Sequence, residues 1–174
     1  MSPPPPDGAA IVDVETLLAD APAGHKRELR LWLRLLACAN LIEGEVRRRL
    51  RLHFDTTLPR FDLLAQLERA GPEGLTLGEV SRRMMVSNGN VTGIAARLVA
   101  EGLVARRANP ADRRAGTLSL TPRGRREFAR QSAAHEEWIA ELLAGLSPAD
   151  QSGLHRLLGR TKQGARAAIG EASE

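Results

Sequence analysis

Short polar side chains gather in one stretch of this 174-residue chain, opposite a row of apolar residues. Val91, Ile94 and Leu98 follow at i, i+3 and i+7, the spacing of one buried helix face. Amide, hydroxyl and guanidinium groups occupy the other faces: Ser87, Asn88, Asn90, Thr92 and Arg97. In the first turns of a helix, such groups can hydrogen-bond to base edges in the major groove of DNA. An ordinary polar surface helix is the alternative.

A basic hairpin follows this helix. Residues 103–107 and 117–121 predict two short strands, and residues 108–116 predict the loop that joins them. Asp112, Arg113 and Arg114 lie in this loop. Arginine suits the narrow, electronegative minor groove, and an acid two residues earlier can orient a guanidinium by a charge-assisted hydrogen bond. A solvated surface loop is the alternative.

The positive charge of the chain is concentrated around these two features. Between residues 76 and 130 there are 11 arginines and 4 acidic residues, a local charge of +7. Because the whole chain carries only +4, the remainder carries −3. This distribution favours an anionic partner such as nucleic acid.

The residues before the polar stretch predict the element that positions it. Thr76 and Glu79 have the spacing of a capping box, which fixes where a helix begins, and Val80 and Met84 then face inward. Residues 85–87 form a turn, and Ser87 is the expected N-cap of the second helix. The pattern is typical of a helix-turn-helix.

Longer helices are predicted on both sides. Apolar residues recur at helical spacing from 25 to about 52, again from 58 to 70, and after Ser147 and Pro148 as far as the frayed tail. A further helix begins at Pro122 and carries a coiled-coil-like seam: Phe128, Ser132, His135, Ile139, Leu142 and Leu146. The first helix is longer than a domain of this size can cover, so we expect part of it to pack on a second subunit.

Composition limits the class of protein. The chain is 43% hydrophobic and only 3% aromatic, which favours a mainly helical domain with a core of Leu, Val, Ile and Ala. No apolar run is long enough to span a membrane, and with a single cysteine and no signal-peptide pattern we expect a cytoplasmic protein. Residues 1–10 predict a proline-rich disordered tail, and residues 11–20 leave open a short accessory helix.

Taken in order, several motifs resemble the MarR family of winged-helix transcriptional regulators, from about residue 25 to 168. The motifs are LPRFDLL at 58–64, NVT at 90–92, EGLV at 101–104, and DRR at 112–114 followed by LSLTPRG at 118–124. The resemblance implies a homodimer formed through the terminal helices, binding to pseudo-palindromic DNA, and repression that ends when an effector binds. It also implies that Asp112 braces the wing and that Arg114 contacts the minor groove.

The resemblance further implies an effector pocket between the dimerisation helices and the DNA-binding region, filled in many relatives by aromatic acids or phenolic compounds. The candidate residues on the first two helices are Trp32, His53, Arg60, Phe61 and Asp62. Arginine beside an aromatic wall suits a carboxylate. The alternative is that Trp32 and Phe61 belong to the core and that Arg60 is a surface or capping charge.

Cys38 and the histidines give little sign of chemistry. Cys38 lies among Leu36, Ala37 and Ala39, so we expect a small buried side chain, with an oxidant sensor as the alternative. His25, His53, His135 and His155 show no metal-ligand spacing. We expect no enzymatic activity, no metal and no cofactor, because no catalytic triad or phosphate-binding loop is present.

The sequence therefore predicts a mainly α fold: a winged helix-turn-helix at residues 58–122 with a small β-hairpin wing, and a dimerisation lobe from residues 25–57 and 123–170, after a tail at 1–24. The predicted function is a homodimeric, DNA-binding repressor released by an aromatic acid, phenolic or acyl-CoA effector. The DNA-contacting residues would be Thr76, Ser87, Asn88, Asn90, Thr92, Arg97, Asp112, Arg113 and Arg114. The alternative is a winged-helix module that binds a protein.

Overall fold

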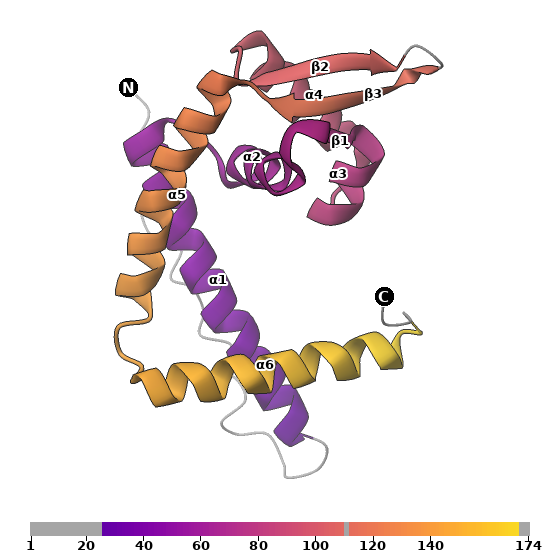
Figure 1. The fold of residues 1–174 in the computed structure, drawn as a ribbon. Helices are drawn as coiled ribbons and strands as arrows, with labels where there is room; N and C mark the ends of the chain where they lie inside the picture. The colour runs from indigo at the N-terminus through magenta and orange to yellow at the C-terminus, as the bar shows by residue number, and fades with distance from the viewer. Residues whose placement is uncertain (1–25, 110–111, 171–174) are drawn as a thin grey trace, which may run out of the picture. The chain divides into compact units, whose positions relative to one another are not determined.

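A computed structural model describes residues 26–109 and 112–170, and the predictions for the tail and for residues 11–20 lie outside these ranges. The elements are α1 (Lys26–Phe54), α2 (Leu58–Ala70), the 3-10 helix η2 (Gly71–Glu73), β1 (Leu75–Thr76), α3 (Leu77–Met84), α4 (Asn88–Ala100), β2 (Val104–Asn109), β3 (Asp112–Leu120), α5 (Pro122–Leu142) and α6 (Pro148–Ala168) (Figure 1). The mainly α fold with a small hairpin is confirmed. The chain forms two compact units that divide within α5, Met1–Ala133 and Ala134–Glu174.

The three strands form one antiparallel sheet in the order β1-β3-β2. Leu75 pairs with Leu118, and Val104 pairs with Leu120. The predicted loop at 108–116 is wrong, because β2 continues to Asn109 and β3 begins at Asp112. The sequence analysis did not predict this extension, because the residues at the hairpin tip are polar or charged and lack the alternating apolar pattern of a strand. The sequence analysis also missed β1, because two residues are too few for an alternating pattern.

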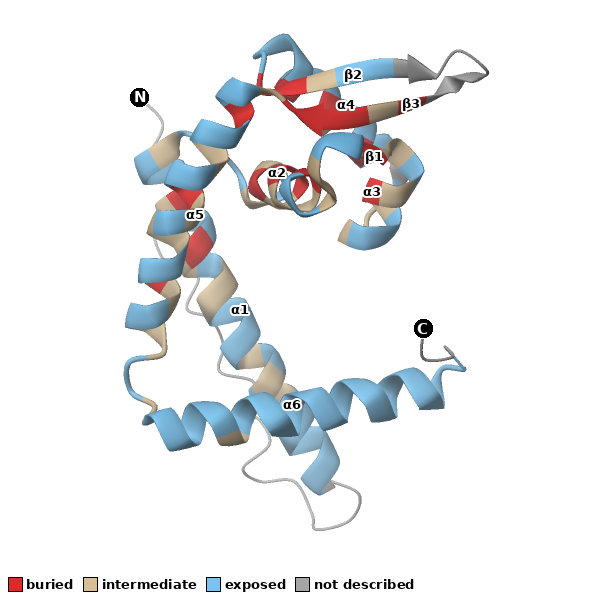
Figure 2. Cartoon of the chain, viewed as in Figure 1, coloured by how far each residue is buried: buried red, intermediate tan, exposed pale blue. Residues whose placement is uncertain are grey.

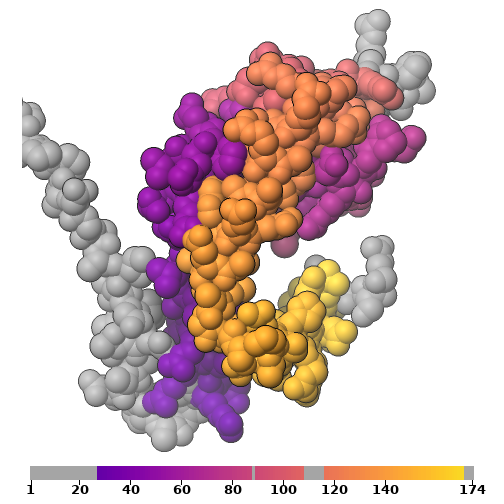
Figure 3. Space-filling model, turned by 60° about the vertical axis from the view of Figure 1, so that its left-hand side comes forward, coloured from indigo at the N-terminus to yellow at the C-terminus, as the bar shows by residue number. Residues whose placement is uncertain are grey.

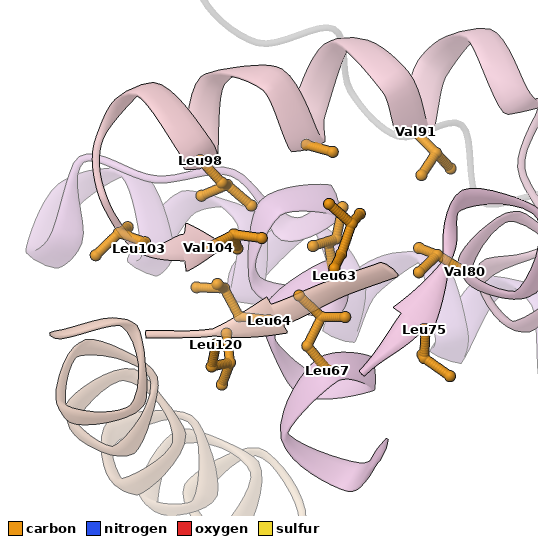
Figure 4. Packing of buried hydrophobic residues seen from close by; sticks show 12 residues of the cluster. Leu63, Leu64, Leu67, Leu75, Val80, Val91, Leu98, Leu103, Val104 and Leu120 are labelled. Carbon is orange, nitrogen blue, oxygen red and sulfur yellow. The ribbon is translucent and has the colours of Figure 1, made fainter. Parts of the chain in front are cut away.

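One apolar cluster holds α2, α3, α4 and the sheet together (Figure 4). The cluster contains Leu63, Leu64 and Leu67 of α2 and Val91 and Leu98 of α4. Its other buried members are Leu75, Val80, Ala95, Leu103, Val104, Leu118 and Leu120. All twelve are at most 8% exposed. Each fully buried Leu or Val contributes about 1.5–3 kcal/mol, so this cluster is the main source of stability in the unit.

The first turn of α5 is tied to the start of the hairpin. The Thr121 hydroxyl donates to the Gly102 carbonyl at 2.7 Å and accepts from the Gly124 amide at 2.9 Å. The Thr121 amide donates to the Leu103 carbonyl at 3.0 Å. Gly124 lies so close to the backbone just before β2 that a Cβ atom there would be 1.9 Å from the Leu103 carbonyl oxygen. Only glycine fits, which accounts for the Pro-x-Gly sequence at this helix start.

Large apolar side chains remain exposed on two helices, α1 and α6 (Figure 2). On α1 they are Leu29, Leu31, Trp32, Leu36, Leu41 and Leu52, and on α6 they are Leu154, Leu157 and Leu158. Cys38 is also exposed, so the predicted burial is wrong: the apolar neighbours that suggested it are themselves only partly covered within this chain. Helix α6 begins at Pro148 after the N-cap Ser147, as predicted, and Ser147 forms a capping box with Asp150.

Two glycines give opposite predictions for stability. In Gly124→Ala the new methyl group must push the Leu103 carbonyl away, so we expect the free energy of unfolding to fall by about 1–3 kcal/mol. Gly78 lies in α3, where a Cβ atom would meet nothing within 4 Å. Gly78→Ala is the matched control and should be neutral or stabilising by up to about 1 kcal/mol. Urea denaturation measures both, and equal effects would contradict the close approach at Gly124.

Candidate nucleic-acid interface

The helix-turn-helix begins at the predicted capping box. The Thr76 amide donates to Glu79 Oε2 at 2.8 Å, and the Glu79 amide donates to Thr76 Oγ1 at 3.3 Å. The hydrogen bond from the Thr76 amide holds the pKa of Glu79 below its ordinary value, with a further contribution from the Thr76 hydroxyl. This carboxylate therefore fixes the first turn of α3 and stays ionised there.

The turn between α3 and α4 depends on a side-chain hydrogen bond. The Ser81 hydroxyl donates to the Val86 carbonyl at 2.5 Å, and Met85 takes a left-handed conformation with φ 54°. Ser87 has the extended backbone of an N-cap residue, as predicted, but its side chain makes no cap hydrogen bond. The predicted N-cap position is confirmed, and the hydroxyl stands exposed at the start of α4.

Helix α4 has one buried face and one exposed polar face, as its sequence predicts. Val91 and Leu98 are fully buried, and Ile94 packs against the same cluster. The exposed polar residues with described side chains are Ser87, Asn90, Thr92 and Arg97, whereas the side chain of Asn88 lies outside the described part of the structure. A Cβ atom at Gly89 or Gly93 would meet nothing within 4 Å. Because these glycines have no side chain, the backbone of α4 is accessible at these two positions, and such a helix can approach a groove closely.

The hairpin projects beyond the helices, and its tip is drawn in grey (Figure 1). Arg106 and Arg107 are exposed on β2. Asp112, Arg113 and Arg114 form the first residues of β3, so the predicted tip residues lie in a strand of the hairpin, while their side chains lie outside the described part. The geometry is that of a wing of two antiparallel strands beside a helix-turn-helix.

The five predicted effector residues differ in their surroundings. Trp32 is 55% exposed on α1, and His53 is exposed near the end of that helix. Phe61 is buried, with its ring 5.5 Å from that of Phe128. Burial raises the pKa of the half-buried Asp62, and Glu43 raises it further. Only Arg60 of the five lines a cavity of about 560 Å³, whose other polar groups come from α5, from Asp55 and Thr56 after α1, and from Glu101 at the end of α4.

The residues of that cavity were missed by the sequence analysis. Arg123, Arg126 and Gln131 line it together with Arg60, although more than 60 positions separate the two segments. No local pattern in the sequence predicts that these two segments lie beside the same cavity.

Among the described residues there is no group of three or more potential metal ligands, and no described helix is long and apolar enough to cross a membrane.

A capped first helix, a tight turn, a second helix with an exposed polar face and an arginine-bearing wing define a winged helix-turn-helix, a DNA-binding class of protein. Comparison with known proteins gives the family. The model of the MarR family matches residues 54–115. A solved MarR family transcriptional regulator from Silicibacter pomeroyi is 31% identical, with a TM-score of 0.69, and the match covers 83% of this chain and 99% of that protein. The chain belongs to the MarR family of transcriptional regulators.

Two further relatives extend the comparison. The transcriptional activatory protein BadR of Rhodopseudomonas palustris is 34% identical over 109 residues, which cover 61% of this chain and 62% of BadR. Sco3205 of Streptomyces coelicolor, solved in complex with DNA, shares the fold with a TM-score of 0.71 at 22% identity, over 83% of this chain and 92% of that one. These relatives are regulators rather than enzymes, as the sequence analysis predicted.

The capping box predicts a specific dependence of stability on pH. Because the pKa of Glu79 is lowered in the folded state, its contribution is complete above the ordinary value of 4.5 and disappears as the pH falls through the lowered value. We expect wild type to be more stable than Glu79→Gln at neutral pH, with a difference that shrinks below pH 4.5. Urea denaturation of both proteins across this range measures it. A difference independent of pH would contradict the role of the charge.

Proposed function

We propose that the protein is a homodimeric, effector-responsive repressor that binds a pseudo-palindromic operator. The observation that carries the DNA-reading part is the exposed polar face of α4, opposite the fully buried Val91 and Leu98. In this proposal two α4 helices contact successive major grooves about 34 Å apart, and the wings contact the flanking minor grooves.

Individual residues have separate roles in the proposed complex. Asn90 and Ser87, with Asn88, contact base edges, because their amide and hydroxyl groups can both donate and accept. Thr76, Thr92 and Arg97 position the helices on the phosphates. Arg114 occupies the minor groove, Asp112 orients it, and Arg113 contacts the backbone.

Exposed apolar side chains support the dimer. Leu154, Leu157 and Leu158 lie at helical spacing on α6, and each is at least 39% exposed. Further large side chains stand exposed on α1, including Trp32 at 55%. A row of this kind at the surface of a chain is typical of an interface. The proposed dimerisation lobe comprises residues 25–57 and 123–170, so Trp32 serves the dimer rather than an effector.

Regulation follows from the requirement for two half-sites. An effector that favours a dimer geometry in which the two α4 helices no longer match successive grooves would release the operator, to the extent of its differential affinity for the two states. An aromatic acid, a phenolic compound or an acyl-CoA is the proposed effector class. Because BadR is named as an activatory protein, a promoter-reporter measurement with and without the regulator is the test of repression.

A binding module for another protein is the second candidate, and salt dependence separates the two. We expect Arg114→Ala to weaken binding to the protein's own promoter region by about 1–3 kcal/mol, and to reduce the slope of log affinity against log salt by about 1. Fluorescence anisotropy with labelled duplexes measures both quantities. Arg160→Ala, on the exposed surface of α6, is the control and should change neither. Equal affinity of wild type for the promoter region and for random duplex would contradict the repressor.

The dimer is tested at α6. Leu157 is 52% exposed, and a charge there should oppose burial against a second copy. We expect Leu157→Glu to raise the dimer dissociation constant at least about tenfold, equivalent to about 1.4 kcal/mol. Gln163→Glu adds the same charge at an exposed polar position of that helix and serves as the control. Analytical ultracentrifugation gives both constants, and a wild-type monomer at micromolar concentration would contradict the dimer.

A further inference from the structure

The first turns of α1 have no buried face of their own. From Arg27 to Glu45 no residue of this helix is buried, and Val46 is the first that is. Figure 2 shows these turns largely in pale blue, and in the space-filling view the indigo residues of α1 lie at the molecular surface (Figure 3). A helix in water takes most of its stability from the packing of one face, so this part of α1 requires a partner.

Two different exposed faces run along this part of α1. One carries Trp32 and is the apolar face assigned above to the dimer. The other is a row of three exposed arginines, Arg27, Arg30 and Arg34, at spacings of three and four. Trp32 is two positions from both Arg30 and Arg34, which is about 200° around a helix. A second subunit on the face of Trp32 therefore leaves this arginine row uncovered.

Large apolar side chains accompany the arginine row. Leu31 follows Arg27 by four positions and is 67% exposed, and Leu41 follows Arg34 by seven positions and is 63% exposed. These spacings place both leucines on the side of the helix that carries the row. A partner for this surface must offer carboxylates to the guanidinium groups and apolar side chains to the leucines.

The chain itself has such a segment just before α1. Residues 7–20 contain four acidic residues and no lysine or arginine, and they include Leu17 and Leu18. The segment lies outside the described residues, and only residues 21–25 separate it from the start of α1. A link this short holds the segment at a high effective concentration beside α1, and its proline and glycine are residues that favour a reversal of the chain.

The spacing of the acids matches the spacing of the arginines. Asp13 and Asp20 are seven positions apart, as are Arg27 and Arg34. A helix of residues 11–20 would be about 15 Å long and would cover about ten residues of α1 in an antiparallel pair. In that pair Asp20 lies opposite Arg27, and Asp13 lies opposite Arg34.

We propose that the arginine row of α1 is the docking surface for residues 11–20 of the same chain, which lie on it as an antiparallel helix. Asp20 and Asp13 pair with the arginines at the two ends of the row. Leu17 packs between them, on the stem of Arg30 and on Leu31. Exposed ion pairs contribute little singly, so the short link and the apolar contact are both needed for stable docking.

A docked segment also shields the arginine row from nucleic acid. An uncovered row of guanidinium groups attracts a phosphate backbone whatever its base sequence. The carboxylates of the segment compete with phosphate for the same groups, so docking lowers non-specific binding and leaves DNA to α4 and the wing. This shielding rests on the proposed DNA-binding function, whereas the docking does not.

Docking is tested with the full-length protein by hydrogen exchange and mass spectrometry. Relative to the intrinsic rate of each sequence, we expect residues 11–20 to exchange about fivefold faster in Asp13→Asn/Asp20→Asn than in wild type, because two exposed ion pairs are lost. Asp7→Asn/Glu15→Gln removes the same charge from the same segment and is the matched control. Asp7 precedes the proposed helix and Glu15 is two positions from Asp13, about 200° around it, so this control should exchange as wild type does.

A charge swap identifies the surface on which the segment docks. Arg27→Glu/Arg34→Glu should also speed exchange of residues 11–20, and Asp13→Arg/Asp20→Arg added to it should restore slow exchange. Arg51→Glu reverses an exposed charge of α1 beyond the reach of the segment and should have no effect.

Exchange of residues 11–20 at the intrinsic rate in wild type would overturn the docking, as would slow exchange that survives in Arg27→Glu/Arg34→Glu. A dimer dissociation constant that rises in this variant, with exchange at residues 11–20 unchanged, would assign the arginine row to a second copy and overturn the docking as well.

Shielding is measured separately, by fluorescence anisotropy with a random duplex. We expect Asp13→Asn/Asp20→Asn to bind it several-fold more tightly than Asp7→Asn/Glu15→Gln, although the two variants carry the same net charge. Equal affinities, with faster exchange seen in the first variant, would overturn the shielding and leave the docking intact. Failure of wild type to bind its promoter DNA would instead count against the proposed function.

Discussion

The buried contact between α2 and α4 is the constraint on which the DNA-reading surface depends. Leu63, Leu64 and Leu67 of α2 belong to one buried cluster with Val91 and Leu98 of α4, and all five side chains are at most 1% exposed. Because an interior at this density does not allow a helix to roll, burial of one face of α4 fixes the other. The polar side chains of α4 are therefore presented by the packing of its opposite face.

Both ends of α4 are further fixed from outside the helix. At its start, the Thr76–Glu79 capping box and the Ser81–Val86 hydrogen bond set the course of the turn. At its end, Arg60 of α2 and Arg123 of α5 hold Glu101. The contacts at the start of α4 join residues that are close in sequence, and they stabilise the fold. The contacts at its end join α4 to segments that lie about twenty or forty positions away, beside a cavity.

The features that were predicted correctly depend on residues that lie close together in the sequence. The capping box at Thr76, the N-cap at Ser147 and the buried face of α4 depend on residues within a few positions of one another, and all three are confirmed. The misses depend on distant residues. Strand β1 forms because Leu75 pairs with Leu118, and Cys38 is exposed because no described residue covers it. The cavity at Arg60 and Gln131 is of the same kind, since four elements must meet to make it.

The central claim is that two copies of this winged helix read DNA together at a fixed separation. Selection of bound duplexes from a random library by the purified protein, followed by sequencing, tests it most directly. The account predicts an enriched inverted repeat whose half-sites lie about 10 base pairs apart, centre to centre, because that separation brings two major grooves to the same side of the duplex. Enrichment of a single half-site, or of no motif at all, would contradict it.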